Sequence, residues 1–480
     1  MEVARRVARN AIYNASGLIV GNVSGLFLTI ILARVLKPEN FGIYSLALSI
    51  AMLSIALANL GVDNAVIRYV AYYAGRNDYA KVRGHFRYFL KVKLLLSTLV
   101  SMSLILLSNQ LAMIFGDERL TLPFVFAGLV VFFASLTNLL NAFFMGLQEF
   151  KYSFLKQVVY EGSRWIFVVP LGILYLASGA ILGFSLAYAT AFLFLLFILI
   201  RKYIYYVRGL AEAADRKVNA FIGFMTIASV SGIIYAYVDS VMIGYLLTPT
   251  DVGYYRVAYV IVFAIVGLIS SFSYVLFPTF TQLSIEDINR SLERLLRYTS
   301  IVAFPSALVI AYLSDKIIKL IYGSDYLPAT APMMVLAFAL IPGAFAYLGT
   351  IFSAKERPEI NASVVTASMI LNVILNYILI ISMGIVGAAI ATVISRFFVI
   401  SITVVLLYRL FRIAPNATAI VKPLVASLIM VVVLMAFSES SMLAKELIGV
   451  ILAGSVYILI LFILRGITLE DINYLRAIIK

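Results

Sequence analysis

Long apolar segments separated by short polar ones follow one another along almost the whole chain. A helix that crosses a bilayer needs about 20 consecutive, mostly apolar residues. Charge clusters, prolines and glycines divide this chain into segments of about that length, so the pattern predicts an all-α polytopic membrane protein. We expect fourteen transmembrane helices, at residues 11–36, 41–61, 86–108, 120–146, 153–176, 179–200, 219–247, 251–277, 297–314, 329–353, 361–382, 385–408, 420–438 and 446–464.

The composition agrees with this fold class. Of the 480 residues, 63% are hydrophobic and 12% are charged, whereas soluble domains average about 45–50% apolar and about 25% charged residues. A water-soluble core cannot bury so much apolar surface. The connections between the predicted helices are too short for a soluble catalytic domain, so we expect the function to be performed inside the bilayer.

Lysine and arginine are distributed unevenly between the two sides of the predicted helices. Most of the 37 basic residues fall on the side that carries the N-terminus, and cytoplasmic loops are the ones that carry an excess of positive charge. We therefore expect a multi-pass protein of the cytoplasmic membrane with both termini in the cytoplasm. The basic residues that give the net charge of +14 then determine the orientation of the protein in the membrane. Their natural partners are anionic membrane lipids rather than nucleic acid.

Residues that bind metals or provide thiol chemistry are nearly absent. The chain has no cysteine and a single histidine, His85, which lies in a polar stretch between Arg83 and Arg87. We therefore expect His85 at the surface and no metal site. The chain also lacks a G-x-x-x-x-G-K-S/T nucleotide-binding loop and a constellation of nucleophile and base. These absences favour a transporter over an enzyme and predict no bound cofactor.

One short phrase occurs twice. LKPENFGIYSLA at residues 36–47 shares Leu, Pro, Gly, Tyr and Ala, at the same places, with LTPTDVGYYRVA at residues 247–258. Proline ends the preceding helix because it lacks an N–H group, and Asn40 or Asp251 can cap the next helix. We interpret the phrase itself as a tight outer turn, and its recurrence as a mark of internal duplication.

The duplication predicts the arrangement of the helices. Both copies lie on the outer side, so the first and the seventh helix run in the same direction, as in a parallel repeat. We expect one six-helix bundle at residues 1–210, a second at 211–412, and two additional helices at 413–480. Two such bundles around a central cleft are typical of an alternating-access transporter.

Longer stretches resemble a known family. ILARVLKPENFGIYSLALSIAMLSIALANLGVDNAVIRYVAYYAGRND (31–78), FMGLQEFKYSFLKQ (144–157) and SYVLFPTFTQLSIED (273–287) are similar to the polysaccharide-transporter and O-antigen flippase branch of the multidrug/oligosaccharidyl-lipid/polysaccharide flippase superfamily. The resemblance implies a V-shaped pair of bundles, as in multidrug transporters. It also implies transfer of oligosaccharide linked to polyprenyl phosphate or diphosphate from the inner to the outer leaflet, alongside glycan-assembly enzymes.

Arginines within the predicted helices are the main candidate site residues, because ionisable groups in the bilayer are costly and mark functional sites. Arg396 lies roughly 16 Å into its helix, near the bilayer centre, without an acidic residue close in sequence. Arg164, Arg256 and Arg34 lie on three other predicted helices. Guanidinium groups bind phosphate through permanent, forked, charge-assisted hydrogen bonds. We expect these four residues to line a cationic passage for the headgroup, as the resemblance also implies.

Each arginine also has a structural interpretation. Glu161 can pair with Arg164 three residues later, Asp239 could pair with Arg256, and Arg34 could extend to the outer headgroups. The acidic residues have a second possible role, because a flippase can be coupled to protons or sodium ions. The candidate carriers are Asp239, Glu161 and Asp63.

Uncharged polar residues form a second candidate group. The spacings of Asn138 with Asn141 and of Asn372 with Asn376 place each pair on one helix face, where they either join helices or bind sugar hydroxyls. Tyr237 and Tyr255, near the second copy of the repeated phrase, could stack on sugar rings.

A cation-coupled multidrug antiporter of the same superfamily is the alternative function. Such an antiporter for cationic drugs needs a mainly acidic and aromatic cavity, whereas arginines predominate among the deep charges of this chain. The lipid-linked oligosaccharide flippase is therefore the leading hypothesis.

Overall fold

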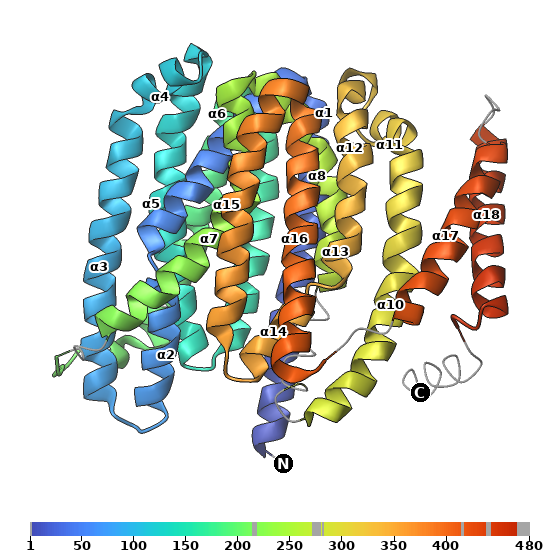
Figure 1. Cartoon of the computed structure of the whole chain (residues 1–480). Helices are drawn as coiled ribbons and strands as arrows, with labels where there is room; N and C mark the ends of the chain where they lie inside the picture. The colour runs from blue at the N-terminus through green and yellow to red at the C-terminus, as the bar shows by residue number, and fades with distance from the viewer. Residues whose placement is uncertain are drawn as a thin grey trace. The chain divides into compact units, whose positions relative to one another are not determined.

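The computed structural model describes residues 2–213, 218–270, 280, 283–413, 417–437 and 443–467. Over these ranges the chain consists of helices joined by short turns and contains no strand (Figure 1). The end of the predicted helix 251–277, most of the motif at 273–287 up to residue 282, and the basic C-terminal tail lie outside the described residues.

The long helices correspond closely to the predicted ones. Among the described residues, ten helices are long and apolar enough to cross a membrane, and Val230–Leu246 and Ile448–Ile463 are shorter apolar helices. The polytopic all-α class is thus confirmed, while the count of fourteen crossings stays a prediction. One of the ten is the segment Ser324–Ala354, which consists of several short helices. The other helices are α1 Glu2–Asn59, α3 Tyr79–Leu106, α5 Thr121–Gly146, α6 Phe150–Lys202, α7 Val218–Leu246, α8 Pro249–Ser270, α10 Ile285–Tyr312, α15 Pro358–Met383, α16 Ile385–Phe411, α17 Ala417–Phe437 and α18 Leu443–Ile463.

Helices α1 and α6 each cover two predicted transmembrane helices. In α1 the backbone leaves the helical region at Lys37, with φ 61°, directly before Pro38. In α6 the break falls at Tyr175 and Leu176, the latter with φ 54°. Each predicted loop is therefore a sharp kink, and sharp kinks need a local cause such as the proline of α1. We have no comparable cause for the kink in α6.

The predicted helix at 297–314 begins too late. Helix α10 starts at Ile285, where the Ser284 side chain accepts a hydrogen bond from the backbone N–H of Asp287. Serine is a preferred N-cap, and acidic side chains stabilise the first turn of a helix. The arginines of this segment suggested a loop, but they lie on the helix.

The predicted span at 329–353 corresponds to Ser324–Ala354, one of the ten segments long and apolar enough to cross a membrane, but the segment is not one regular helix. Pro332, Pro342 and Gly343 interrupt this segment, and proline removes a backbone hydrogen bond and clashes with the preceding turn. The result is a series of short helices: η3 Ser324–Ala329, α12 Thr330–Leu336, η4 Ala337–Ala339, α13 Leu340–Ala344 and α14 Leu348–Ala354. Short helices that the sequence did not predict also occur at α2 Val62–Ala74, α4 Ser108–Ile114, η1 Glu118–Leu120, η2 Ile204–Tyr206 and α11 Ser314–Ile321.

The chain forms two compact units. The first comprises Met1–Val260, Ile321–Pro328 and Val365–Ala388, and the second comprises Ile261–Leu320, Ala329–Val364 and Ala389–Lys480. The predicted division of the chain at residues 210 and 412 stays a prediction.

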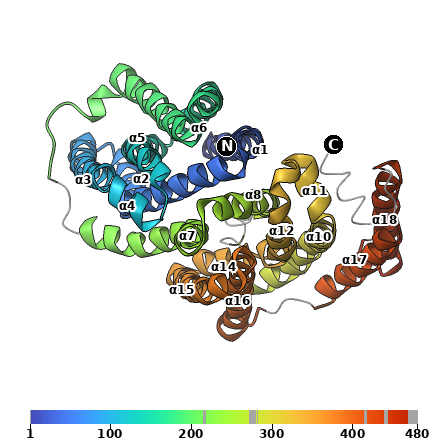
Figure 2. The ribbon, with the colours of Figure 1, turned by 90° about the horizontal axis from the view of Figure 1, so that it is seen from above.

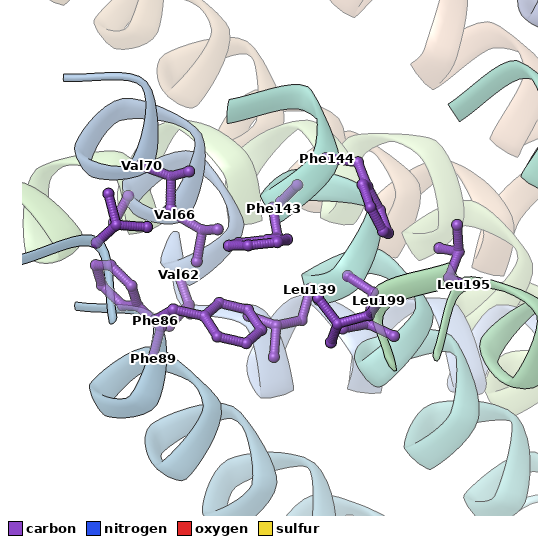
Figure 3. Close-up of a cluster of buried hydrophobic side chains, with 14 of the residues drawn as sticks. Val62, Val66, Val70, Phe86, Phe89, Leu139, Phe143, Phe144, Leu195 and Leu199 are labelled. Atoms are coloured by element: carbon purple, nitrogen blue, oxygen red, sulfur yellow. The ribbon is translucent and has the colours of Figure 1, made fainter. Parts of the chain in front are cut away.

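A cluster of apolar side chains holds together one end of the first unit. Figure 3 shows side chains of α2, α3, α5 and α6 in this cluster. Phe86 and Phe143 are both buried, and their ring centroids lie 4.3 Å apart. Large aromatic side chains supply much of the buried area in such a core. Amphipathic α2 therefore belongs to the bundle and is not a loop.

His85 lies in this region and is fully buried, with 0% exposure, so its predicted surface position is wrong. Its ring stacks on Tyr69 at a centroid distance of 5.1 Å and lies 4.9 Å from the ring of Tyr73. Nδ1 is 2.8 Å from the carbonyl oxygen of Lys81. Helix α3 begins at Tyr79, earlier than predicted, and this places His85 on the helix face that packs against α2.

The second unit contains two further apolar clusters. One joins α10, α14 and α16, and the other joins α17 and α18 to α10. Figure 2 shows α17 and α18 side by side. The Tyr457 hydroxyl of α18 donates a 2.7 Å hydrogen bond to the Ile301 carbonyl of α10, so the two last helices pack on α10.

The two copies of the repeated phrase contact each other within the first unit. A Cβ on Gly42 would overlap the carbonyl of Pro249, and a Cβ on Gly253 would lie 2.5 Å from the carbonyl oxygen of Pro38. Each copy therefore places its glycine against the proline carbonyl of the other. Glycine is required because only it permits this approach of two backbones.

Two turns elsewhere in the chain have matching hydrogen bonds. In the first turn, backbone N–H groups donate hydrogen bonds to carbonyls four residues earlier (from Leu147), three residues earlier (from Gln148) and five residues earlier (from Glu149). The second turn, at residues 355–357, has the same three spacings in the same order. Gln148 and Glu356 both have positive φ, 61° and 59°. The parallel repeat accounts for both likenesses, although the repeat itself stays a prediction.

We predict that Gly42→Ala destabilises the protein by about 1–3 kcal/mol, because an added methyl group in a packed contact forces the backbones apart. Gly162→Ala is the matched control, since nothing lies within 4 Å of a Cβ at that helical glycine and alanine favours helix by up to about 1 kcal/mol. Thermal unfolding of the purified variants measures both changes. Equal melting temperatures for Gly42→Ala and the wild type would contradict the close contact.

Candidate functional site

Helix α1 presents a row of glycines to α6. Gly17, Gly21 and Gly25 follow one another at four-residue spacing. A Cβ on Gly21 would lie 2.8 Å from Nε2 of Gln157, and one on Gly25 would lie 3.9 Å from Nη1 of Arg164. Small residues at this spacing allow close helix approach within membranes. Here they leave room for long polar side chains of α6.

Glu161 is the centre of a buried hydrogen-bond network. Its carboxylate, on a residue only 4% exposed, forms an ion pair with Arg164 Nη1 at 2.9 Å. It also accepts hydrogen bonds from Gln157 Nε2 at 2.9 Å and Ser24 Oγ at 2.7 Å. Trp165 Nε1 donates to Ser24 Oγ at 3.0 Å. Both carboxylate oxygens therefore have two donors each, which compensates for the burial of the charge.

Aromatic rings enclose the guanidinium group of Arg164. It lies 5.1 Å from the ring centroid of Phe184 and 5.4 Å from that of Tyr160. The Tyr160 ring in turn contacts Tyr188 at 4.5 Å. Cations are attracted to aromatic faces at these distances, so the Arg164 side chain is held between its carboxylate partner and the rings.

A second polar cluster joins α7, α8 and α15. Asp239 of α7 is 3% exposed and accepts 2.6 Å hydrogen bonds from the Tyr255 hydroxyl and from Asn376 Nδ2. Asn376 Nδ2 also donates to Asn372 Oδ1 at 3.1 Å. Four residues selected from the sequence thus lie together in one network.

Arg256 of α8 contacts aromatic rings and not Asp239. Its guanidinium lies 5.1 Å from the ring centroid of Tyr259 and 5.6 Å from that of Tyr237. Within the part of the chain that the structure describes, it forms no ion pair, and the suggested pairing with Asp239 does not occur. This half-buried cation is thus attracted to two rings, and no carboxylate of the described ranges neutralises it.

Tyr44 connects the two clusters. This buried residue of the first repeated phrase interacts electrostatically with both Arg164 and Arg256, and also with the hydroxyls of Tyr188 and Tyr237. Tyr255, at the same position of the second phrase, binds Asp239. The repeated tyrosine therefore contributes to the polar clusters, and the interpretation of the phrase as only a turn was incomplete.

The other candidate charges lie apart from these clusters. Asp63 forms a 2.9 Å ion pair with Lys93, a fully buried residue that also donates to Asn59 Oδ1. Arg34 is exposed, and its Nε donates to the carbonyl of Ile321 at 2.6 Å. Arg34 thus lies on α1 just before the kink at Lys37, and its role stays a prediction.

Arg396 belongs to the second unit. Its guanidinium lies 4.2 Å from the ring centroid of Phe263. Of the asparagine pair on α5, Asn141 accepts a 2.6 Å hydrogen bond from Ser153, and Asn138 is half-buried. The described residues contain no group of three or more acidic, histidine or cysteine side chains placed to hold a metal ion.

Solved structures share this fold. The lipid II flippase MurJ in an inward closed conformation has a TM-score of 0.75 over 98% of this chain and 100% of that chain, at 17% sequence identity. A multidrug resistance MATE family transporter of the MOP superfamily in an inward-facing conformation has a TM-score of 0.70 over 84% of this chain and 98% of that chain, at 16% identity. The fold is therefore that of the multidrug/oligosaccharidyl-lipid/polysaccharide flippase superfamily.

Sequence relatives define the family. Residues 7–284 match the family described as polysaccharide biosynthesis protein, and the chain belongs to this family. The probable low-salt glycan biosynthesis flippase Agl15 of Haloferax volcanii is 28% identical over 177 residues, which are 36% of this chain. The match spans 38% of the length of Agl15. The predicted resemblance is confirmed.

Three features of the site escaped sequence reasoning. Tyr44 was treated as part of a turn, and Lys93, within the predicted helix 86–108, and Ser24 were not considered as site residues. The G-x-x-x-G-x-x-x-G pattern at Gly17, Gly21 and Gly25 is the signal that could have located the α1–α6 network, because it predicts a close helix contact.

We predict that Glu161→Gln destabilises the protein by about 3–5 kcal/mol, since it leaves the buried Arg164 charge without a partner. The double variant with Arg164→Gln loses less stability than the sum of the single changes. Unfolding followed by Trp165 fluorescence measures both. Glu149→Gln breaks a partly exposed ion pair with Lys151 on the same helix and serves as control, with an expected loss below about 1 kcal/mol. Additive losses at Glu161 and Arg164 would contradict the coupling.

Proposed function

We propose that this protein is a flippase that moves oligosaccharide linked to polyprenyl phosphate or diphosphate from the cytoplasmic to the outer leaflet by alternating access. Its family membership and its likeness to a glycan biosynthesis flippase and to a lipid II flippase support this proposal. The proposal includes fourteen membrane crossings and both termini in the cytoplasm of the cell that carries it.

The single observation that carries the proposal is the environment of Arg256. A half-buried guanidinium that faces two aromatic rings and no carboxylate of the described chain is a site for an anion. A phosphate or diphosphate leaving water needs charge-assisted hydrogen bonds to replace its hydration. Tyr44 lies within electrostatic range of Arg256, so the headgroup would meet one arginine without an ion-pair partner among the described residues and a nearby hydroxyl.

The remaining candidates have distinct roles in this proposal. Asn372, Asn376 and Tyr237 supply hydrogen bonds and a ring face for sugars near the headgroup. Glu161 and Asp63 each form an ion pair with a cation. Asp239, which accepts hydrogen bonds from Tyr255 and Asn376, is a third candidate carrier of a coupling proton or sodium ion. Arg396, in the second unit, stays a separate candidate for headgroup contact.

The fold of multidrug transporters does not by itself favour an antiporter. The likeness rests on 16% identity, and unrelated substrates are carried by one fold. A cation would be repelled by Arg256, so the flippase accounts better for the charges of the site.

We predict that Arg256→Gln slows glycolipid transfer roughly ten- to hundredfold, because a hydrogen bond to a charged group contributes about 1.5–3 kcal/mol. The rate is measured in proteoliposomes with a fluorescent polyprenyl-diphosphate oligosaccharide and a membrane-impermeant quencher. Arg256→Lys keeps the positive charge but loses the paired N–H donors of the guanidinium, so it should retain part of the glycolipid transfer rate. Arg119→Gln, in an exposed ion pair with Asp117 and Glu39, is the control and should transport normally.

Normal glycolipid transfer by Arg256→Gln would show that Arg256 does not bind the headgroup during transport. The same assay on Arg396→Ala tests the second candidate, for which we expect loss of transfer in a folded protein. Transport of a cationic dye by the wild type, without transfer of the glycolipid, would establish the antiporter instead.

A further inference from the structure

A cavity of about 400 Å³ lies inside the first unit, between the N-terminal part of α1, the end of α5 and the beginning of α6. Ligand pockets of proteins have volumes of about 300–1,000 Å³, so this cavity is large enough for a small organic group. Its lining contains apolar and aromatic surface from Leu18, Phe154 and Met145. The polar side chains of the lining are Asn22, Asn141, Ser153, Lys156, Gln157 and Glu161.

The charges of the lining exclude a cation as the natural occupant. Glu161 is the only carboxylate among the lining residues, and both of its oxygens already accept hydrogen bonds from Gln157, Ser24 and Arg164. The charge of Glu161 is neutralised by Arg164. The carboxylate therefore has no free position at which a metal ion or a drug cation could bind.

Lys156 is the one cation among the lining residues of the cavity, and the Glu161 carboxylate attracts it without forming an ion pair with it. Its ammonium donates to the amide oxygen of Gln157 at 3.2 Å, and it forms no ion pair with the residues that the structure describes. An ammonium has three donors, and a half-buried one without a carboxylate partner is costly. An anionic group in the cavity would supply a direct ion-pair partner for the ammonium.

The remaining polar groups fit hydroxyls. Asn22, Asn141, Ser153 and Gln157 carry amide and hydroxyl groups that both donate and accept hydrogen bonds. Ser153 already donates to Asn141, and Gln157 donates to Glu161 and accepts from Lys156, so sugar hydroxyls would use the remaining donors and lone pairs of these groups. The Tyr13 and Phe154 rings of the lining lie 5.9 Å apart. Since one water occupies about 30 Å³ of liquid, the cavity is far too large for an inorganic phosphate alone. Its size and chemistry together favour a sugar that carries a negative charge.

We propose that this cavity, here called the Lys156 cavity, binds a phosphate-bearing sugar, with Lys156 against the phosphate and Asn22, Asn141 and Gln157 against the hydroxyls. The inference rests on the proposed flippase function. Lys156 lies in the second turn of α6, on the side that the basic residues predict to be cytoplasmic. The cavity is then an entry site, where the headgroup and first sugar of the substrate are held before they reach Arg256.

Trp165 reports on this cavity without interference from other tryptophans. It is the only tryptophan of the chain, and it donates to Ser24, which donates to Glu161 on the wall of the cavity. A ligand that shifts Gln157 or Glu161 changes this chain of hydrogen bonds. Binding can therefore be measured by Trp165 fluorescence, independently of transport.

The test titrates the full-length protein in lipid nanodiscs with a hexose 1-phosphate, the matching neutral hexose and inorganic phosphate. We expect saturable quenching or enhancement of Trp165 fluorescence by hexose 1-phosphate, and binding roughly tenfold or more weaker for the other two probes. Lys156→Gln should weaken hexose 1-phosphate binding to the same degree, and Lys156→Arg should restore it. Lys151→Gln is the matched control, because Lys151 is an exposed lysine on the same helix and pairs with Glu149.

Asn22→Ala gives a second, independent variant at the rim of the cavity. It should weaken hexose 1-phosphate binding and leave the weak binding of inorganic phosphate unchanged. A polyprenyl-phosphate-linked sugar in the nanodisc that displaces hexose 1-phosphate would identify the lipid-linked headgroup as the source of the ligand. A failure to displace would identify a soluble sugar phosphate.

Equal binding of inorganic phosphate and hexose 1-phosphate would overturn the assignment to a sugar, and equal binding by Lys156→Gln and wild type would overturn the assignment to this cavity. Different results would contradict the proposed flippase function. A wild type that transfers glycolipid but shows no Trp165 response would refute only the cavity, whereas binding without transfer would refute only the flippase.

Discussion

Charge compensation inside the bilayer determines the organisation of the first unit. A charged side chain there has little water to solvate it, so protein groups or a ligand must compensate for it. Arg164 has Glu161 and Lys93 has Asp63, at 2.9 Å in both cases. Arg256 has two aromatic rings, and Lys156 has one amide oxygen. Arg164 and Lys93 therefore stabilise the structure through their ion pairs. Arg256 and Lys156 mark sites where a bound anion would supply a counter-charge.

Glycine makes these arrangements possible. On α1 the glycine row opens space for Gln157 and Arg164 of α6. At the repeated phrase, Gly42 and Gly253 let two backbones touch, and this contact brings Tyr44 and Tyr255 to the two polar clusters. Close backbone approach and buried polar networks therefore occur at the same places, since a side chain at these glycines would occupy the space that the polar groups need.

The sequence was sufficient to predict the fold class and most helices, because the length of an apolar segment and the prolines that end it are local signals. It was also sufficient for the Glu161–Arg164 pair, whose spacing places both on one helix face. Contacts between distant helices could not be predicted. Asp239 accepts hydrogen bonds from Tyr255 and Asn376 and does not pair with Arg256. His85 is buried by an unpredicted helix, and Pro342 with Gly343 interrupts a segment whose hydropathy indicated one regular helix.

The central claim is that the transported headgroup is an anion recognised by Arg256 and Lys156, two cations that form no ion pair with the residues that the structure describes. The most direct test compares two fluorescent glycolipids with the same glycan and polyprenyl chain, one joined by a diphosphate and the other by a neutral linkage, in wild-type proteoliposomes. The account predicts protein-dependent transfer of the diphosphate form and little or none of the neutral form. Equal transfer rates for both lipids would contradict it, because the arginine and lysine sites would then have no role in selecting the substrate.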